Sequence, residues 1–141
     1  MTIRRIAAVY GMLVGVAMIG LWITLLLTGE VPELETNPLE IRYHLAAEVL
    51  TAVALVGSGA GLWQGRRWAD RAFAVALGLL LYTVINSAGY YADLGDVGMV
   101  GVFTALTALT AVLVWLSVTR PALFTGGEPE TAAVADAERA D

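Results

Sequence analysis

Four long apolar runs constrain the fold of this chain more than any other feature of its sequence. They cover residues 6–27, 43–63, 72–91 and 97–118 of the 141 residues. A helix needs about 20 apolar residues to cross the hydrocarbon core of a bilayer, so each run is long enough to span a membrane. One acidic residue, Glu48, interrupts the second run, and the other runs contain no charged side chain. The sequence predicts an all-α, polytopic membrane protein whose four transmembrane helices form an antiparallel bundle.

The charged residues predict how these helices are oriented. All eight basic residues are arginines, and six of them flank one side of a four-span chain: Arg4, Arg5, Arg66, Arg67, Arg71 and Arg120. The opposite side carries Arg42 among acidic residues: Glu30, Glu33, Glu35, Glu40, Asp93 and Asp96. Because arginine accumulates in cytoplasmic loops, we expect both termini in the cytoplasm and the acidic side outside. The lysine-free, Ala- and Val-rich composition indicates a prokaryote, so we expect a plasma-membrane location.

Composition also excludes several classes of function. The chain has no cysteine, which rules out disulfides, thiolate nucleophiles and cysteine metal ligands. Its net charge of −5 argues against a nucleic-acid partner. We expect residues 1–120 to form the membrane domain. Residues 121–141 are rich in Gly, Ala, Glu and Asp, so we expect a disordered acidic tail in the cytoplasm.

Two pairs of glycines mark faces on which helices approach closely. Gly11 and Gly15 in the first run, and Gly57 and Gly61 in the second, each follow the small-xxx-small pattern of packed membrane helices. The pattern fits packing within the bundle, and it also fits contacts between copies in a homo-oligomer. Both interpretations stay open at this stage.

The second run contains the residues most suited to chemistry. Glu48 is the one carboxylate well inside a span, and His44 lies four residues earlier, on the same helical face. An ionisable group inside a membrane is costly, which makes it a candidate functional residue. If the tight turn around Arg67 folds the second and third helices together, Glu48 lies level with Asn86, and His44 with Tyr90.

We therefore predict a polar cluster of His44, Glu48, Asn86 and Tyr90 in the outer half of the bundle. Tyr82 is placed deeper, because it precedes Asn86 and Tyr90 on the same i, i+4, i+8 stripe. Arg42 is placed at the mouth of the cluster, although it is more easily paired with Glu40. A purely structural role remains an alternative, with Glu48 hydrogen-bonded to Asn86 and Tyr90 to hold the two helices together.

Three functions fit such a cluster. The first is a small-molecule or proton-linked site, because burial disfavours the charged form of a carboxylate and His44 could relay a proton outward. The second is a protein that binds a lipid- or quinone-type ligand, or an enzyme that acts on one; of these two, we expect binding without catalysis. The third is a non-catalytic accessory subunit of a membrane complex. One histidine and one glutamate are too few for a closed metal site, so we predict no metal and no cofactor.

Two stretches of the sequence carry a family resemblance. They are HLAAE at residues 44–48 and LYTVINSAGYYA at residues 81–92. Together they resemble small four-span membrane proteins of bacteria and archaea that are uncharacterised. The resemblance implies a four-span integral membrane protein embedded in the lipid bilayer, and it implies no particular activity.

Overall fold

The computed structural model describes residues 2–125, and the described part of the chain is helical without strands. Its helices are α1 (Ile3–Thr28), α2 (Glu33–Thr36), α3 (Pro38–Trp63), α4 (Ala69–Asp93), α5 (Val97–Thr119) and the short 3-10 helix η1 (Pro121–Leu123). Helices α1, α3, α4 and α5 are each long and apolar enough to cross a membrane. The prediction of an all-α, four-span bundle is confirmed, and the chain is a multi-pass membrane protein. Residues 126–141, most of the predicted tail, lie outside the described residues.

Local sequence signals set the ends of the helices. Gly29 ends α1 with a φ of 72°, in the left-handed region that glycine adopts without strain. Pro38 occupies the first turn of α3, where its missing N–H costs no hydrogen bond. Gly95 turns the chain between α4 and α5 with a φ of 72°, and the Asp96 side chain then caps α5 by accepting from the Met99 N–H at 3.0 Å.

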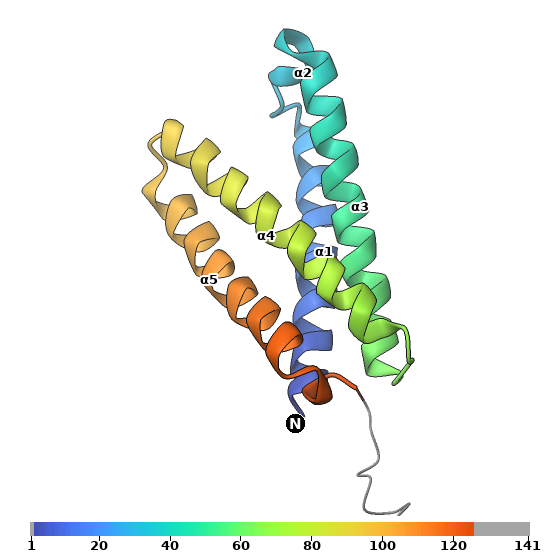
Figure 1. Ribbon diagram of the computed structural model, residues 1–141. Coiled ribbons are helices and arrows are strands. Elements are labelled where there is room, and N and C mark those ends of the chain that lie inside the picture. Colours follow the sequence, from blue (N-terminus) through green and yellow to red (C-terminus); the bar gives the residue numbers. More distant parts are fainter. Residues whose placement is uncertain (1, 126–141) are drawn as a thin grey trace, which may run out of the picture.

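The four long helices form two hairpins. Helix α1 packs along α3, and α4 packs along α5, while the tight α3–α4 turn joins the two hairpins (Figure 1). We call the end that holds the start of α1, the α3–α4 turn and the end of α5 the arginine end. The opposite end, with α2 and the α4–α5 turn, is the acidic end. The hairpins meet at the arginine end and diverge toward the acidic end, so the bundle is V-shaped.

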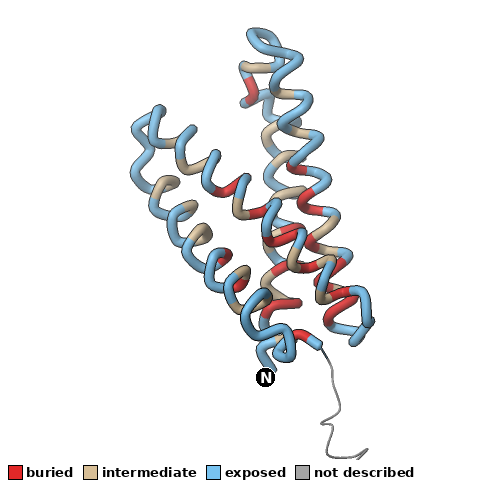
Figure 2. The backbone as a smooth tube through the Cα atoms, viewed as in Figure 1, coloured by how far each residue is buried: buried red, intermediate tan, exposed pale blue. Residues whose placement is uncertain are grey.

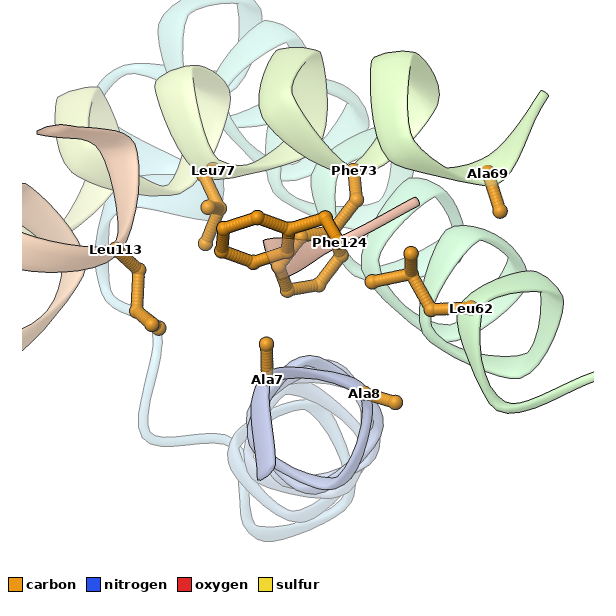
Figure 3. Close-up of a cluster of buried hydrophobic side chains, with 8 residues drawn as sticks. All are labelled: Ala7, Ala8, Leu62, Ala69, Phe73, Leu77, Leu113 and Phe124. Atoms are coloured by element: carbon orange, nitrogen blue, oxygen red, sulfur yellow. The ribbon is translucent and has the colours of Figure 1, made fainter. Parts of the chain in front are cut away.

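The main apolar core fills the closed half of the V. Buried positions gather toward the arginine end, as Figure 2 shows. There the rings of Phe73 and Phe124 lie 6.4 Å apart and occupy the space between α1 and α4 (Figure 3). The cluster draws on all four long helices and on the segment after η1; its other members are Ala7, Ala8, Leu62, Ala69, Leu77 and Leu113. Because Phe124 is buried, packing continues into residues 121–125, which the sequence assigns to the tail.

Glycines allow the helices to approach closely. A Cβ atom added at Gly15 would lie 2.7 Å from the carbonyl oxygen of Ala52, and one at Gly11 would lie 2.6 Å from the Phe73 ring. A Cβ at Gly61 would lie 2.9 Å from the Cβ of Ala69, whereas nothing lies within 4 Å at Gly57. Packing within the bundle therefore accounts for three of the four glycines that the sequence singled out.

A part-buried hydrogen bond connects the two hairpins through α1 and α5. The hydroxyls of Tyr10 and Thr110 lie 2.7 Å apart. Thr110 donates its own proton to the Leu106 carbonyl at 2.7 Å, so Tyr10 is the donor in the bond between the hairpins. This bond lies in the closed half of the molecule and helps to fix where the V begins to open.

Candidate ligand-binding cleft

A cleft of about 580 Å³ occupies the open half of the V, between the two hairpins. Its volume falls within the range of roughly 300–1,000 Å³ that is usual for small-molecule sites. Its deeper walls are apolar and come from α1, α4 and α5: Val14, Met18, Leu80, Val84, Phe103 and Leu106. Polar and acidic side chains line the part nearer the acidic end. The cleft therefore joins an apolar interior to a charged mouth.

Glu48 lies in the wall of this cleft and is held by residues of two helices. Glu48 as a whole is only 8% exposed. The indole N–H of Trp22 on α1 donates to its Oε2 atom at 2.6 Å, and the Nε2 atom of His44 lies 3.5 Å from its Oε1 atom. The rings of Trp22 and His44 also meet edge to face, with centroids 6.0 Å apart. The three side chains form a compact group that faces the cleft.

The pairing of His44 with Glu48 is the part of the predicted cluster that the geometry reproduces. Their i, i+4 spacing on α3 brings the side chains together as expected. The two differ in exposure, since 42% of the His44 side chain is exposed against 10% of the Glu48 side chain. His44 therefore lies between the buried carboxylate and the open mouth of the cleft.

Trp22 is the functional candidate that sequence reasoning missed. A tryptophan near the end of a membrane span is ordinarily interpreted as an interfacial anchor. The signal was present, because Trp22 and Glu48 lie equally far before and after Glu35 in the α1–α3 connection. Folding the chain there places the two at similar depth on neighbouring helices, just as the α3–α4 turn does for Glu48 and Asn86. An indole N–H in a bundle also needs an acceptor.

The hydrogen bonds of Asn86 and Tyr90 with Glu48, on which the structural alternative depends, are not formed within the described residues. The Asn86 Nδ2 atom donates to the Tyr82 carbonyl of its own helix at 2.9 Å. The Tyr90 hydroxyl donates to Oε1 of Glu33 at 3.0 Å. Both residues line the cleft, but across it from Glu48. The reason is the V shape, because α3 and α4 diverge toward the acidic end and equal depth no longer gives contact.

Tyr82 and Arg42 lie outside the cleft lining, which corrects their predicted places in the cluster. Tyr82 is 67% exposed. In a helix of 3.6 residues per turn, a residue four positions away is rotated by about 40° around the helix axis. Tyr82 is two such steps from Tyr90, so the two side chains lie on different faces of α4. Arg42 is also exposed. Within residues 2–125 it forms no ion pair, so the expected pairing with Glu40 is absent.

Tyr91, which the predicted cluster did not include, also lines the cleft near its mouth. The ring of Tyr91 stacks on Phe103 of α5, with centroids 5.5 Å apart and planes inclined by 15°. It also meets Tyr90 edge to face at 5.3 Å. The helical spacing of α4 could have predicted the position of Tyr91. Ser87 follows the buried Val84 by three residues and Tyr91 follows Ser87 by four, so all three lie on one face of the helix.

The charges of the cleft are of one sign. Four glutamates line it, and no arginine does: Glu30, Glu33, Glu40 and Glu48. Within residues 2–125, none of these carboxylates forms an ion pair with an arginine. The same part of the chain contains no group of three His, Asp or Glu residues placed to hold a metal ion.

Comparison with known proteins gives a family and no activity. The chain belongs to the family described as "Domain of unknown function (DUF8058)", whose model matches residues 1–123. No curated protein and no solved structure matches it. The matched residues include the four long helices and the whole cleft, so the cleft belongs to the family domain.

Proposed function

We propose that this protein binds a small amphipathic molecule in the cleft between its two hairpins. The observation that carries the proposal is Glu48, a carboxylate in the wall of an otherwise mostly apolar cleft, with Trp22 and His44 fixing its position. A charged group inside a membrane protein is costly to keep. A cleft of this kind, apolar with a few oriented polar groups, is the usual form of a small-molecule site.

The proposed ligand enters from the outer half of the plasma membrane of a prokaryotic cell. The support is the gathering of arginines at the arginine end, because arginine accumulates on the cytoplasmic side of membrane proteins. The cleft opens toward the acidic end, between helices whose ends diverge. A lipid- or quinone-type molecule in the outer leaflet would reach it with its polar head near the membrane surface.

Binding is favoured over proton conduction across the bundle. Conduction needs a chain of polar groups from one side of the membrane to the other. The arginine-end half is filled by an apolar core around Phe73 and Phe124. His44 and Glu48 can exchange a proton with the acidic end, but this core blocks its onward path. We therefore do not propose a channel.

Native mass spectrometry of the protein, purified from its membrane in mild detergent, tests this proposal. We expect wild type to retain an added non-protein mass, and His44→Ala and Glu48→Gln to lose most of it. Glu35→Gln is the matched control, because Glu35 is an exposed acidic residue that does not line the cleft. The proposal fails if wild type carries no added mass, or if the cleft variants retain it as fully as the control. A protein that co-purifies in place of a small molecule would favour the accessory-subunit alternative.

A further inference from the structure

We infer that the cleft selects a cation with an apolar body, such as a protonated amine or a quaternary onium ion on a hydrocarbon or aromatic frame. The inference rests on the proposed function and specifies its ligand class. It follows from three features of the same cleft: the sign of its charges, the aromatic side chains near its mouth, and the apolar walls beneath them.

The charges at the cleft favour a cation and oppose an anion. Glu30, Glu33 and Glu40 lie near the mouth, and Glu48 lies further along the wall. No arginine within residues 2–125 is paired with them. Their fields add within a cleft that has low-dielectric walls, where charges interact more strongly than in water.

Glu48 retains the capacity to act on a ligand. A carboxylate has two oxygens that together accept about four hydrogen bonds. The neutral N–H of Trp22 uses one position on Oε2, and Nε2 of His44 lies near Oε1. No arginine within residues 2–125 pairs with Glu48, so its carboxylate can still accept hydrogen bonds or an ion pair from a ligand cation.

Aromatic rings supply the second element of cation recognition. The faces of tyrosine and tryptophan attract cations through their quadrupoles, by about 0.5–2 kcal/mol for each good contact. Trp22 on α1 and both Tyr90 and Tyr91 on α4 line opposite sides of the cleft. An onium head between them would lie among carboxylates and aromatic side chains.

The apolar walls favour a ligand whose charged group is attached to an apolar body. Below the carboxylates the lining is mainly aliphatic or aromatic, with Met18 from α1, Leu80 and Val84 from α4, and Phe103 from α5. Thr83 also lines the cleft there, but its hydroxyl donates to the Leu80 carbonyl of its own helix at 2.9 Å. A small hydrated cation would gain nothing from these walls, whereas an apolar body would fill them. The ligand therefore needs both parts.

The same charges argue against a second copy of the chain in the cleft. The acidic end of another copy would bring its own glutamates and aspartates, with Arg42 as the one basic residue among them. Like charges at close range repel, so a partner of identical sequence does not complement the cleft. An anionic lipid headgroup is disfavoured for the same reason.

Two probe ions of matching shape and opposite charge test the inference. Tetraphenylphosphonium and tetraphenylborate are measured by equilibrium binding to the full chain in phosphatidylcholine nanodiscs, with binding to empty nanodiscs subtracted. We expect the cation to bind and the anion not to bind. Glu48→Gln should weaken cation binding about tenfold, Glu33→Gln by a smaller factor, and the control Glu35→Gln should leave it unchanged.

The outcomes separate this inference from the proposed function. Equal binding of both ions, or cation binding that survives Glu48→Gln undiminished, overturns the cation class. Failure of the phosphonium ion to bind also overturns the cation class. The proposed function is then still tested separately, by whether wild type retains a native non-protein mass. A native mass that the phosphonium ion displaces, and the borate ion does not, would support both.

Discussion

The same four helices pack closely in one half of the bundle and diverge in the other. In the arginine-end half, alanine and glycine lie at the helix contacts, and Phe73 is fully buried among them. In the acidic-end half, the facing positions hold Trp22, Tyr90 and Tyr91, together with carboxylates. Small side chains let helix backbones approach, whereas large and charged ones hold them apart. The cleft therefore results from the size and charge of the side chains at the facing positions, because the helices themselves are continuous through both halves.

The contrast has a consequence for where stability resides. The closed half contains the main core cluster, the bond between Tyr10 and Thr110, and the buried Phe124. The open half, within the described residues, has one side-chain hydrogen bond across the cleft, from the exposed Tyr90 to the half-buried Glu33. Substitutions in the closed half should therefore cost stability, and those in the open half should cost binding.

The largest effect is expected from Phe73→Ala. It removes a ring that is 0% exposed and leaves a cavity that lipid does not reach. We expect the free energy of unfolding in detergent to fall by about 3 kcal/mol. Phe103→Ala is the matched substitution in the open half, and its partly exposed ring should cost about 1 kcal/mol or less. Equal losses would show that the two halves do not differ in packing as described.

A smaller effect is expected from Gly15→Ala. The new Cβ would lie 2.7 Å from a backbone oxygen of α3, so α1 must move away from α3. Overpacking of this kind costs about 1–3 kcal/mol, and thermal unfolding followed by tryptophan fluorescence would measure it. Gly20→Ala is the control on the same helix, because nothing lies within 4 Å of its added Cβ. The description of the α1–α3 contact is wrong if both variants unfold alike.

The smallest change in stability, but a visible change in shape, is expected from Tyr90→Phe. It removes the hydrogen bond across the cleft, at a cost of less than about 1 kcal/mol because this bond is exposed to solvent. The chain lacks cysteine, so spin labels can be attached at introduced cysteines alone. We expect the distance distribution between labels at Leu39 and Leu94, at the acidic end, to broaden in this variant.

Labels at Ile6 and Val118, at the arginine end, provide the control for that measurement. Both positions are exposed, and the hairpins are packed together beside them. Their distribution should be narrow in wild type and unchanged by Tyr90→Phe. Equally broad distributions at both ends would contradict the contrast between a closed and an open half.

Much of the fold was predictable, because the signals for it are local. Run length alone predicted four membrane-spanning helices, although the second apolar run begins at residue 43 and α3 already begins at Pro38. The short α3–α4 turn made those helices neighbours. The i, i+4 spacing placed His44 beside Glu48. Each of these inferences needs only the rise and period of a helix or the length of a loop.

The rest of the site was decided by the tertiary structure. Depth along a helix follows from counting residues, but the partner of Glu48 depends on how the helices cross. Because α3 stays beside α1 and diverges from α4, Glu48 meets Trp22 and not Asn86. The burial of Phe124 likewise requires a core that only the packed hairpins create. The sequence by itself determined the helices and their order; the angle between the hairpins, set by side chains distant in sequence, decided that they enclose a cleft.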